Sequence, residues 1–342
     1  MSEPEAGLLP VPVPAPLLRL GAAAYGAVVA GRNRRFDRGV GVRRLPCPVI
    51  SVGNLSVGGT GKTPVVAWVA RRLAASGRRP VIALRGYRPD ASGTSDEAAL
   101  HRELLPEVPI AVGADRIAAI RALGEPRDER TVVVLDDGFQ HRRLHRDFDL
   151  VLVDATRPDL ADRLIPYGRL REPLASLARA DALLVTRADG VDEGLANALA
   201  RHHGRLPVAW SRHAWSGLSL WHRGVGTPVP LSWLDGRRLA TLLGVGHPEA
   251  IRRQLAAFGG RDVLAVPARD HDAYGPSRLA RILDRCRGEP SLDAVLTTAK
   301  DWTKLRSRWP EDLAVAVPDL AIEFIAGEAA LESSILAALS GV

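Results

Sequence analysis

The residues best suited to chemistry form a glycine-rich segment at 51–64, with the sequence SVGNLSVGGTGKTP. It follows an apolar stretch that favours a strand and opens a stretch that favours a helix, which is the context of a phosphate-binding loop (P-loop). In such a loop, glycines let backbone N–H groups converge on phosphate oxygens at the helix N-terminus. The lysine reaches the β- and γ-phosphates, and the hydroxyl after it binds Mg²⁺. Nucleotide binding is therefore predicted for eight residues: Ser56, Val57, Gly58, Gly59, Thr60, Gly61, Lys62 and Thr63.

The use of lysine supports this interpretation. Ser56 stands where the general motif has glycine, and a glycine-rich turn that binds no nucleotide is the alternative. Of the 46 basic residues, however, all are arginine except Lys62, Lys300 and Lys304. Because a lysine ammonium is compact whereas a guanidinium is a wide planar fork, we expect lysine to persist where the compact charge matters.

A second group of polar residues, DDGFQH, follows an apolar stretch at 131–135. An apolar strand that ends in carboxylates holds the magnesium ion in many P-loop enzymes. Asp136 and Asp137 are therefore expected beside the metal, although adjacent acids at a strand end also cap helices. Guanine-reading proteins usually carry Asn-Lys-x-Asp after a later strand, and TRAD at 186–189 does not match it. The sequence favours adenine, or a base that is read loosely.

Other polar segments each allow two interpretations. The RGYR sequence at 85–88 suits phosphate or substrate binding, or a salt-bridged turn. Asp96 lies in a loop or at a helix start, where an N-cap is the simpler interpretation. Glu172 could supply a further carboxylate to the metal or merely begin a helix. The DHDAY sequence at 270–274 places His271 beside acids in a loop, where a surface residue and a catalytic residue both fit.

The surrounding pattern predicts the elements that position these residues. Apolar β-branched runs alternate with helical patterns, which predicts a parallel sheet covered on both faces. Strands are expected at 48–52, 80–84, 131–135, 150–153, 182–186 and 207–210, and helices at 62–76 and 114–123 among others. A tryptophan-rich connector of short antiparallel strands is expected at 210–233, followed by a second, smaller α/β domain. In that domain, strands are expected at 262–266 and 294–298, and helices at 249–258, 277–287 and 328–339.

The N-terminal region suits contact with a membrane surface. Residues 3–16 read as a flexible proline-rich leader without the basic region of a secretory signal. The apolar run at 20–31 is shorter than the ~20 residues that span a bilayer. Clustered arginines follow it, which fits a helix lying in the membrane interface, and a helix packed on the protein's own core is the alternative. The expected division is a leader and interfacial helix at 1–36, a P-loop kinase domain at 37–225 and a C-terminal domain at 226–342.

Composition narrows the range of partners. The 342 residues suffice for roughly two domains, and the net charge of +7 suits an acidic partner such as a phosphate or an anionic membrane face. Nucleic acid is disfavoured, because aromatic residues make up only 5% and no basic stretch is interleaved with them. The two cysteines, Cys47 and Cys286, cannot form a disulfide framework, which favours a reducing compartment.

Together these segments resemble one family, the tetraacyldisaccharide 4′-kinases of lipid A biosynthesis. The matching pieces run in the family's order across about residues 17–305, and the P-loop string and DDGFQH are the most specific. Ser56 is what this family tends to have at that position. Two departures are SDE at 95–97, where the family often has GDE, and Gly275, where it usually has Thr. The matching segments are 51–64, 85–87, 95–97, 135–144, 170–174, 244–248, 270–274 and 297–301.

The resemblance implies a reaction. The chain would transfer the γ-phosphate of ATP, with Mg²⁺, to the 4′-hydroxyl of a tetraacyl glucosamine disaccharide 1-phosphate, giving the 1,4′-bisphosphate, lipid IVA. It would do so at the cytoplasmic face of the bacterial inner membrane, with no obligate protein partner. An acidic lipid substrate would also account for the arginine-rich surface.

The resemblance also implies roles for residues. Asp96 would be the general base for the 4′-hydroxyl, oriented by His271 from the other lobe, and Lys62 would act with them in catalysis. The expected metal ligands are Thr63, Asp136, Asp137 and Glu172. The expected substrate-binding residues are Arg85, Tyr87, Arg88, Gln140, His141 and Arg171.

Two other classes of protein share parts of this pattern. An NTP-hydrolysing switch or assembly factor at the membrane needs the same P-loop but no acyl-sugar site, and the missing guanine motif disfavours a GTPase. A membrane-bound binding protein with a degenerate nucleotide site is disfavoured by the intact Lys62, Thr63 and Asp136.

Overall fold

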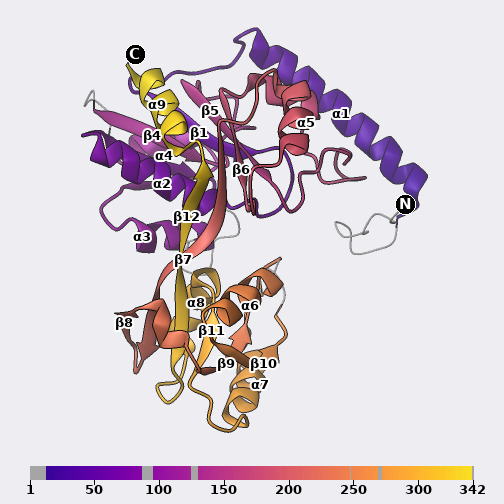
Figure 1. The fold of residues 1–342 in the computed structure, drawn as a ribbon. Helices are drawn as coiled ribbons and strands as arrows, with labels where there is room; N and C mark the ends of the chain where they lie inside the picture. Colours follow the sequence, from indigo (N-terminus) through magenta and orange to yellow (C-terminus); the bar gives the residue numbers. More distant parts are fainter. Residues whose placement is uncertain (1–12, 87–94, 125–129, 247, 269–271, 341–342) are drawn as a thin grey trace. The chain divides into compact units, whose positions relative to one another are not determined.

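The computed structural model describes residues 13–86, 95–124, 130–246, 248–268 and 272–340 (Figure 1). The chain divides into two compact units. Unit 1 comprises Met1–Gly86, Leu105–Arg212 and Ile322–Val342, and unit 2 comprises Tyr87–Leu104 and His213–Ala321. Each unit contains parallel strands and helices, so the predicted class, a P-loop parallel sheet domain with a second, smaller α/β domain, is confirmed.

Unit 1 is built on a parallel sheet in the order β3-β2-β4-β1-β5-β6. Its strands are β1 (Val49–Asn54), β2 (Arg79–Leu84), β3 (Ile110–Val112), β4 (Thr131–Asp136), β5 (Phe148–Asp154) and β6 (Ala182–Thr186). Strands β1, β4, β5 and β6 are buried at every position, as in parallel sheets covered on both faces. The helices are α1 (Ala15–Asp37), α2 (Lys62–Ala75), α4 (Arg116–Ala122), α5 (Glu193–His203), α9 (Glu328–Leu339) and the 3₁₀ turn η1 (Leu174–Arg179).

The order of strands in unit 1 places two motifs side by side. Strands β1 and β4 are parallel neighbours, with Val52 opposite Asp136. Because the carboxyl ends of parallel strands meet at one edge of a sheet, the P-loop after β1 and the acids after β4 lie together. Apolar clusters that include Phe139 and Leu135 form the core of this unit.

Unit 2 holds three short parallel strands in the order β10-β9-β11, with β12 parallel to β11. Their bounds are β9 (Arg238–Leu242), β10 (Arg261–Val266), β11 (Ala294–Thr297) and β12 (Val315–Ala326). The expected connector is one long strand, β7 (Ala209–His222), paired antiparallel with the short β8 (Val225–Val229). The helical segments are α3 (Asp96–Leu104), α6 (Pro248–Ala257), α7 (Pro276–Arg287), α8 (Ala299–Leu305), η2 (Leu231–Leu234) and η3 (Arg306–Arg308).

The division into units differs from the expected cut at 225 in three segments. Residues 213–225, expected in the P-loop domain, belong to unit 2. Helix α3 belongs to unit 2, where it packs against α8. Helix α9, expected in the C-terminal domain, belongs to unit 1, because β12 carries the chain across the boundary at Ala321. There, Glu328 of α9 accepts hydrogen bonds from Trp68 Nε1 at 3.0 Å and Arg72 Nη2 at 2.6 Å, both in α2.

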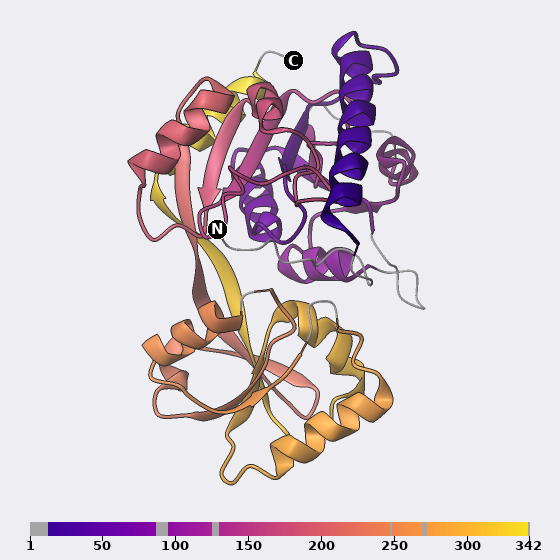
Figure 2. The same cartoon turned by 90° about the vertical axis from the view of Figure 1, so that its right-hand side faces the viewer.

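Helix α1 lies along unit 1 as one uninterrupted helix (Figure 2). Ala22 and Val29 are its buried residues, whereas Leu17, Leu20 and Val28 on other sides of the helix are 58%, 69% and 71% exposed. One face of α1 therefore packs against the protein and another leaves apolar side chains exposed, while the membrane interface stays a prediction. Among the described residues, no helix is both long and apolar enough to cross a membrane.

Candidate active site

The P-loop connects the end of β1 to the start of α2. Gly58 and Gly61 have φ values of 111° and 79°, in the left-handed region that glycine adopts without strain. Gly61 is the N-cap of α2, and no acidic residue lies in the first turn of that helix. The N-terminus of α2 therefore presents backbone N–H groups and a positive dipole end to an anion.

Lys62 lies at the first position of α2, and its ammonium group is held by two side chains. Its Nζ donates a hydrogen bond to Asn54 Oδ1 at 3.0 Å, and it lies 3.5 Å from Asp137 Oδ1. Asn54 is the last residue of β1, and it is completely buried. The ammonium is therefore fixed at the mouth of the loop, where the β- and γ-phosphates of a nucleotide would lie.

The two acids after β4 occupy different environments. Asp136 is the last residue of the strand and is buried, whereas Asp137 adopts a φ of 57° and its side chain is 39% exposed. Burial would raise the pKa of the Asp137 carboxyl, but the charges of Lys62 and Arg171 outweigh it and hold that pKa well below its usual range. Asp137 is therefore ionised at neutral pH and neutralises the two cations beside it.

Arg171, predicted to bind substrate, instead directs its guanidinium at the protein. It donates from Nη1 to Asp137 Oδ2 at 2.7 Å, and from Nη2 to Asn54 Oδ1 at 2.7 Å and Asp137 Oδ1 at 3.0 Å. Its Nε also donates to the Ser56 carbonyl at 3.2 Å. Arg171 thus joins the end of β1, the beginning of the P-loop and the acid after β4.

Glu172, predicted as a metal ligand, lies in a different cluster. Its side chain is completely buried, and its carboxylate is bound by Arg32, Asn33 and Arg179. Within the described part of the chain, no three His, Cys, Asp or Glu side chains gather so as to hold a metal ion. Of the expected ligands Thr63, Asp136, Asp137 and Glu172, the last therefore lies apart from the others, because two guanidinium groups already neutralise it.

The remaining donors still fit a magnesium nucleotide. Mg²⁺ is usually bound by one or two carboxylates together with substrate phosphates and water, so a full protein cage is not required. The buried carboxylate of Asp136 and the hydroxyl of Thr63 provide such a partial set beside the glycines of the loop. Among the described residues, the buried Thr60 Oγ1 has no hydrogen-bond partner, which also fits a loop that binds a ligand.

Comparison with known proteins decides the family. A family model for tetraacyldisaccharide-1-P 4′-kinase matches residues 14–340. The chain belongs to this family. Curated relatives named tetraacyldisaccharide 4′-kinase include one from Geobacter sulfurreducens, 38% identical over 84% of this chain and 84% of the relative. Another, from Anaeromyxobacter sp. (strain K), is 38% identical over 95% of this chain and 91% of the relative.

A solved structure agrees. LpxK from Aquifex aeolicus, in a crystal structure with ATP, matches with a TM-score of 0.72 and 29% sequence identity. The match covers 95% of this chain and 99% of that one. The resemblance predicted from the motifs to the tetraacyldisaccharide 4′-kinase family is confirmed.

Gln140, predicted from the family pattern to bind substrate, contacts the strand that precedes the P-loop. Gln140 Nε2 donates to the Asn54 carbonyl at 3.0 Å, which connects the DDGFQH segment to the end of β1. Burial and the charges of Arg116 and Arg146 lower the pKa of the neighbouring His141 to about 4. The His141 imidazole is therefore neutral at neutral pH and can both donate and accept a hydrogen bond.

The other residues predicted for catalysis or substrate binding lie in segments after β2 or outside the described residues. Arg85 follows β2 and is exposed. Asp96 is the first residue of α3, in unit 2. Tyr87, Arg88 and His271 lie outside the described residues.

The structure adds kinase residues that sequence reasoning missed. Asn54 holds both Lys62 and Arg171, and its place in the P-loop string was the available signal. Arg187 adopts a φ of 54° and pairs with the buried Asp154, and an added Cβ at Gly59 would lie 3.9 Å from its Nη2. It belongs to the TRAD segment that was considered only as a base-reading element. No local pattern marks it as a neighbour of the P-loop.

Proposed function

We propose that this kinase transfers the γ-phosphate of ATP to the 4′-hydroxyl of a tetraacylated glucosamine disaccharide 1-phosphate, giving the 1,4′-bisphosphate. The family match over residues 14–340, which includes an assembled P-loop, carries this conclusion. A switch or assembly factor that only hydrolyses NTP is not favoured, since the whole chain follows the family's pattern.

Phosphoryl transfer depends mainly on positioning and charge neutralisation. Lys62, oriented by Asn54 and Asp137, supplies a compact positive charge for the transferring phosphoryl group. Mg²⁺, held by Asp136 and Thr63, would supply further charge neutralisation at the phosphate oxygens. Arg171 bonds to both Asp137 and the beginning of the P-loop and so fixes their relative positions. It therefore acts as a positioning residue.

The acceptor side of the reaction rests on the family pattern. We propose Asp96 as the base for the 4′-hydroxyl, with His271 orienting it, and Arg85, Tyr87, Arg88, Gln140 and His141 as contacts to the acidic substrate. The start of α3 and the neutral imidazole of His141 support these roles.

The activity itself is the first prediction. With purified acyl-disaccharide 1-phosphate in mixed micelles and γ-labelled ATP, we expect label to appear in the lipid product and to be lost when EDTA removes Mg²⁺. A parallel measurement of free phosphate serves as the control. Release of label as free phosphate, with none in the lipid, would contradict the kinase and favour the NTP-hydrolysing switch.

We further propose that α1 holds the kinase at the cytoplasmic face of the inner membrane as a peripheral protein. Leu17, Leu20 and Val28 are exposed on α1, and Arg34 and Arg35 follow them on the same helix. An apolar face with basic residues at one end is typical of a helix that lies in an anionic membrane interface.

The second prediction tests this face. The double substitution Leu20→Ser with Val28→Ser is expected to lower the fraction of protein that floats with anionic liposomes several-fold, because it removes exposed apolar contact. Leu206→Ser, at a position 58% exposed away from α1, is the matched control. The melting temperature should stay nearly constant in both variants, since surface substitutions usually change stability by less than ~0.5 kcal/mol. Equal flotation of all three proteins would exclude α1 as the membrane contact.

A further inference from the structure

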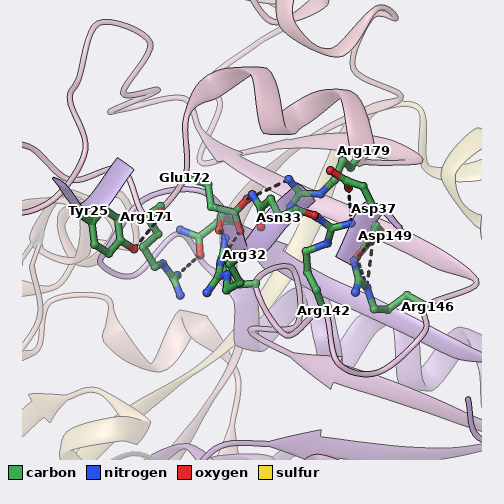
Figure 3. Close-up of polar contacts among 12 residues, drawn as sticks. Tyr25, Arg32, Asn33, Asp37, Arg142, Arg146, Asp149, Arg171, Glu172 and Arg179 are labelled. Carbon is green, nitrogen blue, oxygen red and sulfur yellow. Dashed lines mark hydrogen bonds and ion pairs between the residues drawn. The ribbon is translucent and has the colours of Figure 1, made fainter. Parts of the chain in front are cut away.

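Helix α1 is attached to unit 1 by polar side chains on one face. Tyr25, Arg32 and Asn33 lie along the helix at the spacing of a single face. The Tyr25 hydroxyl donates to the Arg171 carbonyl at 2.9 Å, and the other two bind Glu172 (Figure 3). These three side chains therefore converge on two consecutive residues, Arg171 and Glu172, that follow the P-loop by more than a hundred positions.

Glu172 is the centre of this attachment. Its Oε2 accepts hydrogen bonds from Asn33 Nδ2 at 2.7 Å and Arg179 Nη1 at 2.9 Å, and its Oε1 lies 3.3 Å from Arg32 Nη2. A completely buried carboxylate requires such partners, because an unpaired charge in the interior is strongly unfavourable. Helix α1 supplies two of these three donors, the Arg32 cation and the Asn33 amide, whereas the second cation, Arg179, lies outside the helix.

Arg171, the residue before Glu172, contacts the residues around the P-loop. The Arg171 guanidinium contacts Asp137, Asn54 and the Ser56 carbonyl, and its backbone N–H donates to the Leu55 carbonyl at 2.8 Å. Of these two consecutive residues, Glu172 thus binds side chains of α1 (Figure 3), and Arg171 binds the residues at the beginning of the P-loop. A shift of Glu172 must move Arg171 as well, because the two are consecutive residues.

A second set of contacts, made by Arg142 and Arg179, also connects α1 and Glu172 to the DDGFQH segment. Arg142, in the segment after Asp137, donates from Nη1 to the Asn33 carbonyl at 3.1 Å and from Nη2 to Asp37 Oδ1 at 2.7 Å. Arg179, the third partner of Glu172, lies with its guanidinium carbon 4.5 Å from the centre of the Phe139 ring. Both arginines connect the Glu172 and α1 contacts to the DDGFQH segment, which carries Asp137.

We infer that Glu172 is a positioning residue through which the inner face of α1 holds Arg171, and with it Asp137 and the first half of the P-loop, in the geometry needed for phosphoryl transfer. This inference rests on the proposed kinase function. It gives α1 a role that is separate from membrane contact: the inner face is needed even when the substrate is presented in detergent micelles. A misplacement of about 1 Å in such a site can cost ~10²-fold in rate.

The test compares substitutions of Arg32 and Asn33 in mixed micelles, where membrane binding does not limit the rate. Arg32→Ala and the milder Asn33→Ala are expected to lower kcat by about 10- to 100-fold. The KM for the lipid should change little, because these side chains act through Glu172 and Arg171 on the P-loop. Arg32→Lys keeps the charge beside Glu172 and should retain most of the activity. Arg201→Ala, an exposed arginine on α5, is the matched control.

Melting temperatures and the affinity for an ATP analogue distinguish a loss of positioning from a loss of folding. Melting temperatures identify any variant that is unfolded at the assay temperature, and in that case Asn33→Ala is the variant that decides. Unchanged kcat in folded Arg32→Ala and Asn33→Ala proteins would overturn the positioning role. Affinity for a fluorescent ATP analogue is measured separately. If the wild type phosphorylates no lipid, the proposed function fails, whereas a loss of ATP affinity restricted to the Arg32 and Asn33 variants would still support the coupling.

Discussion

Replacing Lys62 by alanine is expected to lower kcat by about 10³-fold or more, which comes close to abolishing transfer. The ammonium is the positive charge at the start of α2, and Asn54 and Asp137 hold it at the mouth of the P-loop. Its loss removes charge neutralisation where negative charge is greatest in the reaction. The fold should persist, because Arg171 continues to neutralise Asp137. The measurement is kcat with labelled ATP, together with the melting temperature of the variant.

Lys62→Arg is the informative control for this prediction. It keeps the charge, but the planar guanidinium is wider than an ammonium and cannot occupy the same position between Asn54 and Asp137. We therefore expect arginine to restore little of the rate, in a chain that uses arginine almost everywhere else. Near-normal turnover in a folded Lys62→Ala protein would remove the lysine from the mechanism.

The P-loop is predictable from sequence because its chemistry is local. The glycines, Lys62 and Thr63 are consecutive or nearly so, and the strand before them and helix after them follow from simple apolar patterns. The placement of Asp136 also follows, because neighbouring parallel strands carry their ends to the same edge. Each of these predictions needs only short stretches of sequence and one rule of sheet topology.

Glu172 shows why the other contacts of the site could not be predicted from the sequence. Its partners in α1 lie 139 and 140 residues earlier in the chain, and no pattern in the sequence pairs them. An acid beside an arginine after a nucleotide motif suggests a metal ligand as readily as a buried anchor. Only the burial of Glu172 and its three donors decide between the two. Arg171 is similar, since a guanidinium suits a phosphate until the structure shows it bound to Asp137, Asn54 and the loop backbone.

The placement of α3 and α9 in the two units was also not predicted, because it depends on contacts between residues far apart in the sequence. Helix α9 was expected in the second domain because it follows that domain in the sequence. The long strand β12, which contains Pro318 and was not expected, carries the chain back to α2. Helix α3 joins unit 2 through its packing on α8 rather than through sequence proximity.

That placement of α3 bears on the proposed general base. Asp96 and His271 were expected in separate lobes, but Asp96 begins α3, which belongs to unit 2 and packs against α8. Three residues after position 271, Tyr274 is completely buried and donates from its hydroxyl to Asp301 Oδ1 of α8 at 2.9 Å. Helix α8 therefore contacts both the helix that Asp96 begins and the residue that closes the DHDAY segment.

This shared support leads to the sharpest prediction for the pair. A carboxylate alone is a weak base at neutral pH, and a histidine beside it can orient it and share the proton as the hydroxyl attacks. Asp96→Asn and His271→Ala should therefore each lower kcat by about 10²–10⁴-fold. Groups that act as a unit lose their effect together, so the double variant should be little worse than the more damaged single one.

Three measurements decide whether Asp96 and His271 work together. ATP affinity should persist in both single variants and in the double variant, because the P-loop and Lys62 are untouched. The kcat values complete a double-mutant cycle, in which a large coupling between the two positions is expected. If the two losses multiply, each residue acts independently and the shared-proton model fails. Tyr274→Phe extends the test: it removes the bond to Asp301, so its effect on kcat should shrink once His271 is already alanine.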